Sequence, residues 1–215
     1  MGFKEITGQD YTEDLIKRLK GEYPERAFLK QFREILQERL KPGSSMLDIG
    51  CATGYAYNSF KNSGITYTGL DIEEEYIRIA SEYFRDNPQV NFIQHDTAMS
   101  ASPKIADIVI CSATLEHCSG LMPTLKHLTD AARHHILLRT FLGEREEIYS
   151  ISSPISQYEK THKKYYNQYS FKNVLSYLNQ RGFKVRVCRD EFTDSMPQFL
   201  DGVIRTFFII YATKS

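Results

Sequence analysis

The chain has 215 residues, a length that suits one domain built around a single hydrophobic core. Lysine plus arginine and aspartate plus glutamate number 27 each, so no overall charge favours a nucleic acid or an acidic membrane as partner. The 4 cysteines form no C-x-x-C pair, which predicts a reducing compartment, the cytoplasm. No apolar run approaches the roughly 18 residues that span a bilayer, and residues 1–14 lack signal-peptide features, so neither a membrane span nor secretion is expected.

The first part of the chain predicts two helices. Apolar residues recur at helical spacing over residues 11–20 and 24–40. Pro42 and Gly43 then end the second helix. We therefore expect residues 1–43 to form a helical cap ahead of the first strand.

Strands and helices alternate over residues 44–142. The expected strands are 45–49, 65–70, 90–94, 105–111 and 135–141, and the expected helices are 55–62, 73–86 and one that begins at residue 121. Such alternation predicts a parallel sheet with helices on both faces. The fold class that follows is α/β, with a Rossmann-like, doubly wound, mostly parallel seven-stranded sheet.

The last part of the chain departs from this alternation. Residues 143–169 are polar with patchy periodicity, and an irregular segment of that length in a compact domain is usually functional, so we expect a substrate lid. Ser170 is expected to cap a helix that runs to Gln180 and that Gly182 ends. Residues 183–189 and 203–213 follow as two strands without a helix between them, which predicts an antiparallel pair at the sheet edge. Residues 170–215 would thus form a C-terminal helix and strand pair.

Polar and small residues gather where the predicted strands end. A small-residue turn lets backbone amides and the next helix approach a ligand, while a carboxylate on the second strand can accept both hydroxyls of a ribose. Here the turn spans residues 48–54 and the carboxylate is Asp71. Asp96 ends the third strand and Cys111 with Ser112 the fourth. Because open α/β sheets bind ligands at the carboxyl ends of strands, an adenosine-containing ligand is predicted.

These segments resemble the class I methyltransferases that depend on S-adenosylmethionine (SAM). The sequence DIGCATG over residues 48–54 is similar to their D-x-G-x-G-x-G signature, and residues 69–71 are similar to their ribose-binding strand. His95 and Asp96 resemble the position beside the adenine, and residues 105–117 resemble the fourth motif, with its L-E-H ending. The resemblance covers about residues 45–143, and the 170–182 helix more faintly. It implies a SAM-dependent methyltransferase and is silent about the substrate.

The resemblance also implies a cofactor site. Its expected members are Asp48, Gly50, Cys51, Ala52, Gly54, Asp71, Ile72, Asp96, Thr97, Cys111 and Ser112. The two-residue spacing in the turn fits SAM better than the G-x-G-x-x-G turn of dinucleotide sites. Ala52 stands where the signature has its middle glycine, and its methyl group narrows the space for backbone approach.

The candidate catalytic residues lie beyond the fourth strand and in the insertion. Methyl transfer needs the reacting atoms held in line, and a base only where the acceptor must lose a proton. His117 is the candidate base, with a role in structuring the loop as its alternative. Glu116 is a candidate for substrate contact, or else a cap for the following helix. Further candidates for the acceptor pocket, on the insertion, are Tyr149, Tyr158 and His162.

The expected reaction is methyl transfer to an oxygen or nitrogen atom of a small-molecule acceptor. A protein or RNA methyltransferase and a non-catalytic SAM-binding protein remain alternatives, and an NAD oxidoreductase is a distant fourth. No metal is expected, because no group of possible ligands has the spacing of a metal site. The sequence indicates neither the acceptor, nor the attacking atom, nor the oligomeric state.

Overall fold

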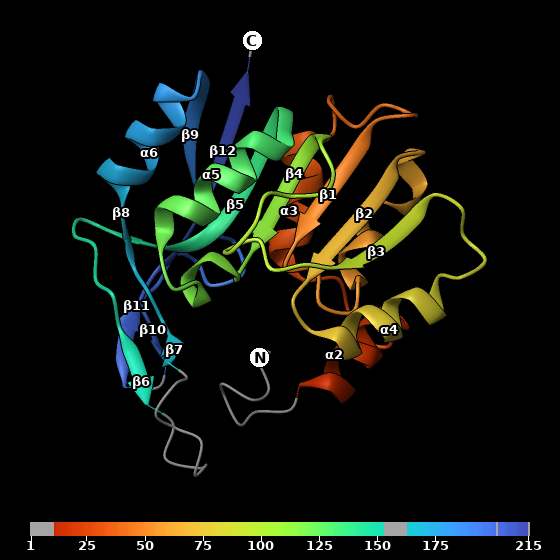
Figure 1. Cartoon of the computed structure of the whole chain (residues 1–215), viewed down its shortest axis with the longest axis horizontal. Helices are drawn as coiled ribbons and strands as arrows, with labels where there is room; N and C mark the ends of the chain where they lie inside the picture. The colour runs from red at the N-terminus through yellow and green to blue at the C-terminus, as the bar shows by residue number, and fades with distance from the viewer. Residues whose placement is uncertain (1–10, 153–162, 201, 215) are drawn as a thin grey trace.

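The computed structural model describes residues 11–152, 163–200 and 202–214. One large twisted sheet runs through the molecule (Figure 1), in the strand order β3-β2-β1-β4-β5-β12-β9. Its strands are β1 (Ser45–Ile49), β2 (Thr66–Asp71), β3 (Val90–Gln94), β4 (Ala106–Ser112), β5 (Ala132–Gly143), β9 (Phe183–Arg189) and β12 (Phe207–Lys214).

The pairing of these strands gives the sheet its class. The first five strands pair in parallel, whereas β12 runs antiparallel to both of its neighbours, β5 and the edge strand β9. This arrangement confirms the predicted Rossmann-like, mostly parallel fold, and it places the antiparallel strand one position inside the edge.

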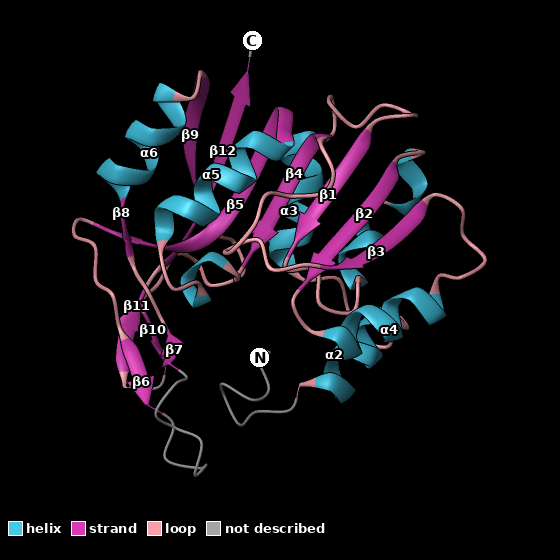
Figure 2. Ribbon diagram, in the orientation of Figure 1, coloured by secondary structure: helices cyan, strands magenta, loops and turns pink. Residues whose placement is uncertain are grey.

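Helices cover both faces of the sheet (Figure 2). One face carries α3 (Ala27–Leu36), whose buried Phe28, Leu29, Phe32 and Leu36 recur at helical spacing and pack with β1 and β4. The other face carries α5 (Leu121–Ala131) and α6 (Phe171–Gln180). Two further helices are α2 (Thr12–Leu19) and α4 (Glu74–Tyr83). No helix among the described residues is long and apolar enough to cross a membrane.

The helix expected over residues 55–62 is wrong in kind. The segment forms two short 3₁₀ helices instead, η1 (Tyr55–Ser59) and η2 (Lys61–Ser63), between Gly54 and Gly64, which are both left-handed. Asparagine and serine side chains offer the backbone other hydrogen-bond partners and so disfavour a regular α-helix, and this segment holds two of each.

The expectation of an irregular segment over residues 143–169 is also wrong in part. The described portion contains an antiparallel pair, β6 (Ser150–Ser152) with β7 (Lys163–Tyr165), and a short strand β8 (Tyr169–Ser170) that pairs with β5. Strands of two or three residues are too short to leave a visible alternation of apolar and polar residues. Ser170 occupies the N-cap position of α6, but its hydroxyl lies against the carbonyl of Glu144 and caps no helix amide.

The strand expected over residues 203–213 is divided in two. Its first part, β11 (Val203–Arg205), forms a hairpin with β10 (Gln198–Leu200), and only β12 joins the main sheet. At the break, the buried side chain of Arg205 donates to the carbonyl of Tyr166 and pairs with Glu147. The antiparallel pairing predicted with residues 183–189 is confirmed for β12.

Candidate functional site

The turn after β1 packs tightly against its neighbours. Gly50, Ala52 and Gly54 have φ angles of +77°, +49° and +74°, in the left-handed region that glycine adopts without strain. A Cβ on Gly50 would lie 2.0 Å from the hydroxyl of Thr114, and one on Gly54 would lie 2.4 Å from the ring of Phe92. The loop after β4 and strand β3 therefore pack directly against the turn. Ala52 adopts the left-handed conformation that glycine prefers.

Asp71 ties the end of β2 to this turn. Its carboxylate accepts a hydrogen bond from the Ala52 amide at 2.8 Å and another from the Glu73 amide at 2.9 Å. A carboxylate offers about four acceptor positions, so two remain for a ligand's hydroxyl groups. Burial raises the pKa of Asp71 to about 6, which leaves the group ionised at neutral pH.

Asp48 is the second carboxylate of the site. It is buried at the end of β1, and the hydroxyl of Tyr67 donates to it. Burial raises the pKa of Asp48 to about 7, against the effect of the Tyr67 hydrogen bond, and the nearby charge of Asp71 adds to the rise. Two interacting carboxyl groups at this edge favour a ligand that carries a cation or hydrogen-bond donors.

The next predicted positions lie beside these carboxylates. Ile72 follows Asp71 with 38% of its surface exposed, which leaves an apolar side chain free to cover a flat ring. Asp96 follows β3 and accepts from the Ala98 amide at 2.9 Å. Thr97 is buried, and its carbonyl lies 2.8 Å from Nδ1 of His127, which gives that histidine a structural role.

Three other predicted positions can serve a ligand mainly through the backbone. The side chains of Cys51 and Cys111 are buried, and burial raises the pKa of both thiols. Their thiols are therefore inert parts of the fold. Ser112 ends β4, and its buried hydroxyl has no hydrogen-bond partner within the described part of the chain.

The loop after β4 is held by the insertion. It contains η3 (Leu115–His117), in which Nδ1 of His117 lies 2.9 Å from the carbonyl of Tyr165, and the His117 ring meets Tyr166 edge-on at 5.2 Å. Tyr169 donates from its hydroxyl to the carbonyl of Leu115 at 2.8 Å. His117 thus has the loop-structuring contacts that were its alternative role, and its role as a base stays a prediction.

Glu116 points into the protein. Its side chain is 1% exposed and accepts a hydrogen bond from the Thr140 hydroxyl at 2.8 Å. Burial raises the pKa of Glu116. The capping alternative is wrong, because α5 begins after Gly120 with no side-chain cap. Substrate contact by Glu116 is untested, and this carboxyl group faces β5 instead of the surface.

The insertion contributes both surface and core. Tyr149 is 37% exposed, while Tyr158 and His162 lie outside the described residues. The polar segment expected to form a lid also contributes Asn167 and Tyr169 to the interior, and both side chains are fully buried. The long separation along the chain hid these contacts, since both side chains bond to the β4 loop some fifty residues earlier.

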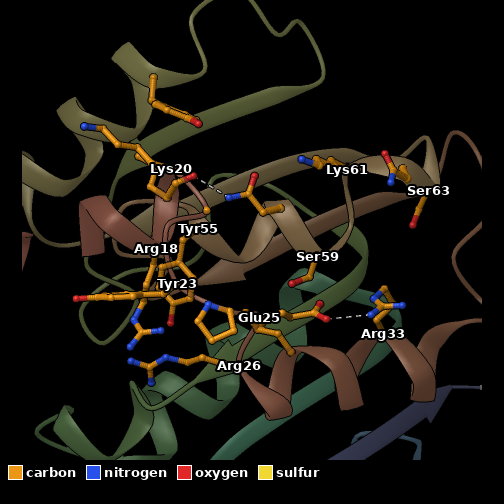
Figure 3. Close-up of a pocket in the computed structure, with 17 residues that line it drawn as sticks. Arg18, Lys20, Tyr23, Glu25, Arg26, Arg33, Tyr55, Ser59, Lys61 and Ser63 are labelled. Carbon is orange, nitrogen blue, oxygen red and sulfur yellow. Dashed lines mark hydrogen bonds and ion pairs between the residues drawn. The ribbon is translucent and has the colours of Figure 1, made fainter. Parts of the chain in front are cut away.

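One feature of the site has no counterpart among the sequence predictions. A cavity of about 610 Å³ lies between the α2–α3 segment and η1–η2, and Tyr55, the residue after Gly54, lines it (Figure 3). Arginines at its wall come from α2 and from the start of α3. No motif marks these positions, so only the folded chain reveals them.

Comparison with known proteins identifies the family. A family model described as "Methyltransferase domain" matches residues 19–186. Ubiquinone biosynthesis O-methyltransferase of Rickettsia felis is 30% identical over 84 residues, which are 39% of this chain and 34% of that protein. The chain spans less than half the length of the curated relatives that it matches.

Solved structures agree in fold. Magnesium protoporphyrin IX methyltransferase of Synechocystis PCC 6803, with bound S-adenosylhomocysteine (SAH), is 17% identical with a TM-score of 0.60, over 95% of this chain and 96% of that one. The 1,6-didemethyltoxoflavin-N1-methyltransferase of Burkholderia thailandensis, with bound 1,6-didemethyltoxoflavin and SAH, is 15% identical with a TM-score of 0.60, over 95% and 86%. At such identities these matches show the fold alone. Because the family model covers most of the chain, the protein belongs to the methyltransferase domain family, as the resemblance in its sequence implied.

Proposed function

We propose that this protein transfers the methyl group of SAM to an oxygen or nitrogen atom of a small-molecule acceptor. The observation that carries the proposal is the closed turn at residues 48–54 bonded to Asp71, a carboxylate with acceptor positions left for two ribose hydroxyls. The family supports methyl transfer. The name of the relative from Rickettsia felis, an O-methyltransferase, supports oxygen as the attacking atom, and the fold shared with an N1-methyltransferase is compatible with nitrogen.

The side chains and backbone groups at the strand ends match the chemical groups of SAM. Asp71 would hold the ribose, Ile72 and Asp96 the adenine, and Asp48 with the backbone of 50–54 the amino-acid tail. SAM supplies a methyl group that its sulfonium has already activated. The task left to the protein is to hold the acceptor in line and to exclude water.

His117 is proposed as the group that accepts a proton from the acceptor. A carbonyl oxygen can only accept a hydrogen bond, so the contact with Tyr165 assigns the proton of the neutral ring to Nδ1 and the lone pair to Nε2. That tautomer is the one a general base needs, and the insertion keeps the ring in place.

The division of labour along the chain is part of the same proposal. Residues 1–43 act as a helical cap, 44–142 as the SAM-binding core, 143–169 as the substrate lid and 170–215 as the C-terminal helix and strands. The four cysteines are all free thiols, which supports a cytoplasmic location.

A turnover assay tests the function. The protein is incubated with SAM and panels of hydroxyl-bearing and amine-bearing small molecules, and SAH is measured by mass spectrometry. We expect acceptor-dependent SAH and an acceptor heavier by one methylene unit. Methylation of protein or RNA with no small-molecule turnover would contradict the acceptor class, and a protein that does not bind SAH would contradict the function itself.

A further inference from the structure

The cavity between the α2–α3 segment and η1–η2 is strongly basic. Its charged lining consists of Arg18, Lys20, Arg26, Arg33, Lys61 and a single carboxylate, Glu25. Arg33 pairs with that carboxylate at 3.0 Å, so four cations remain without compensation from the lining itself. We call this cavity the basic pocket. Its volume of about 610 Å³ lies within the range of about 300–1,000 Å³ that small-molecule sites occupy.

Two arginines lie at the end of the basic pocket beside Tyr23 and Tyr55 (Figure 3). Figure 3 shows the side chains of Arg18 and Arg26 extending toward the same region, beside Tyr23 and Tyr55. Arg18 lies over the ring of Tyr23 at 5.0 Å, and neither arginine has an ion pair with any carboxylate among the described residues. Each guanidinium carries five N–H donors in a fixed plane, a geometry that suits oxyanions.

Of the two arginines, Arg26 gives the stronger indication of an anionic ligand. Its Nε is buried and has no hydrogen-bond partner within residues 11–152, 163–200 and 202–214. Burial lowers the pKa of Arg26, and the charges of Arg18 and Arg139 act in the same direction, against opposing effects of Tyr55 and of the Asp14 carboxylate. A buried donor without a partner, on a guanidinium close to a second one, costs stability that an anionic ligand would restore.

The end of the basic pocket at Tyr55 lies next to the proposed cofactor site. Tyr55 lines the pocket and directly follows Gly54 of the turn. Thr53 donates to the carbonyl of Leu15 at 3.1 Å, and Asn58 donates to that of Leu19 at 2.8 Å. These bonds fix α2, which carries Arg18, directly on the turn. A molecule in the basic pocket would therefore lie against Tyr55, the residue that follows the turn.

We propose that the basic pocket binds a phosphate group of the methyl acceptor, with Arg18 and Arg26 as its direct ligands and Lys20 and Lys61 at its rim. The inference rests on the proposed function for the acceptor, while the pocket itself does not depend on it. Phosphate is favoured over carboxylate because its dianion and three free oxygens match two planar guanidiniums better than one carboxylate does. The rest of the cavity accommodates the organic part of the ligand.

Calorimetry with matched aromatic probes tests the proposal. Phenyl phosphate, benzoate and phenol are titrated into the whole protein, with and without saturating SAH. We expect phenyl phosphate to bind, benzoate to bind about tenfold more weakly, and phenol to give no binding. Added salt should weaken the binding of phenyl phosphate. Equal binding of phenyl phosphate and benzoate would overturn the assignment to phosphate, and no binding of either would overturn the pocket.

Variants assign the binding to the two arginines. Arg18→Gln and Arg26→Gln should each weaken phenyl phosphate about tenfold and leave the affinity for SAH unchanged. Arg78→Gln, an exposed arginine on α4, is the control and should change neither. If either pocket variant weakens SAH and spares phenyl phosphate, that arginine serves the cofactor and the proposal is wrong.

Two further measurements keep the outcome decisive. Should Arg26→Gln fail to fold, Lys61→Gln at the exposed rim replaces it and should weaken phenyl phosphate by about threefold, and no change would count against the pocket. Binding of phenyl phosphate by a protein that does not bind SAH would contradict the proposed function and leave the pocket intact. Binding of SAH by a protein that does not bind phenyl phosphate would contradict the basic pocket and leave the proposed function intact.

Discussion

We expect cofactor binding to depend most on Asp71. It bonds to two backbone amides and keeps acceptor positions for a ribose. Asp71→Ala should weaken SAH binding by roughly 1.5–3 kcal/mol, because charge-assisted hydrogen bonds are lost. Calorimetric titration measures the change, with Asp86→Ala, an exposed carboxylate after α4, as the control. An unchanged dissociation constant would show that Asp71 does not contact the cofactor.

The same carboxylate predicts how SAH affinity depends on pH. A ribose hydroxyl donates to an ionised carboxylate, and burial raises the pKa of Asp71 to about 6. Affinity should therefore fall as the pH drops through 6, since protonation removes the acceptor. Asp48, with a pKa of about 7, titrates close by, so Asp71→Asn is needed to separate the two. In Asp71→Asn the SAH affinity should no longer fall as the pH drops through 6. If the affinity falls as it does in the wild type, the titrating group is Asp48.

Ala52 predicts a gain in stability. Its φ of +49° is unfavourable for any residue with a Cβ, and this backbone strain destabilises the folded state by about 1 kcal/mol or more. Ala52→Gly removes this strain, although the more flexible unfolded chain offsets part of the gain. We expect urea unfolding to give a free energy equal to or up to about 1 kcal/mol above that of the wild type. A clear loss would mean that the methyl group makes packing contacts worth more than the strain.

At the scale of elements, a buried ion pair joins β5 to the segment after β9. Arg139 donates to Asp190 through two bonds of 3.0 Å, and both side chains are at most 3% exposed. Phe207 stacks under the guanidinium at 3.7 Å. Burial alone would raise the pKa of Asp190, but the bonds from Arg139 hold it below its ordinary value.

Asp190→Asn should lower the free energy of unfolding by about 3 kcal/mol, because a buried guanidinium is left uncompensated. Glu82→Gln, which breaks an exposed pair on α4, is the matched control and should cost under about 0.5 kcal/mol. Since the lowered pKa of Asp190 stabilises only the ionised form, the wild type should lose this contribution as the pH falls below about 4, and the variant should not. Equal losses in both variants would contradict the role of the ion pair.

The insertion is expected to respond to ligand. The β6–β7 pair is joined to the β4 loop through His117 and Tyr165, so ordering at the site should reach it. Hydrogen exchange, measured with and without SAH and an acceptor that supports turnover, should show added protection over residues 143–169. Identical exchange in both states, or turnover that survives deletion of the segment, would show that the acceptor is held elsewhere.

The elements also show what sequence can and cannot predict. Strands β1 to β4 lie within a residue of their predicted ends, because each is an apolar run bounded by turn residues. The resemblance predicts the positions of a cofactor site but not the orientation of their side chains, and the side chain of Cys111 lies in the core. The basic pocket could not be predicted, since three segments create it by tertiary contact.

In the whole molecule, the residues proposed to bind the cofactor and the acceptor lie at one end of the sheet. Figure 1 shows α2 and the β6–β7 pair at the end where the parallel strands β1, β2 and β4 terminate. The turn, Asp71 and the loop with His117 lie at that same edge. Open α/β sheets bind ligands there because strand ends and helix starts converge. We propose that the N-terminal cap and the insertion supply the two sides of an acceptor site.

The identity of the cofactor is the central claim, and calorimetric titration of the whole protein with SAH and, separately, with NAD tests it most directly. The turn at residues 48–54 does not have the G-x-G-x-x-G spacing of a dinucleotide site. The position of Asp71 alone does not separate the two cofactors, because both SAH and NAD contain a ribose. We predict binding of SAH with a dissociation constant on the order of micromolar, and none of NAD. Binding of NAD without SAH would contradict the account.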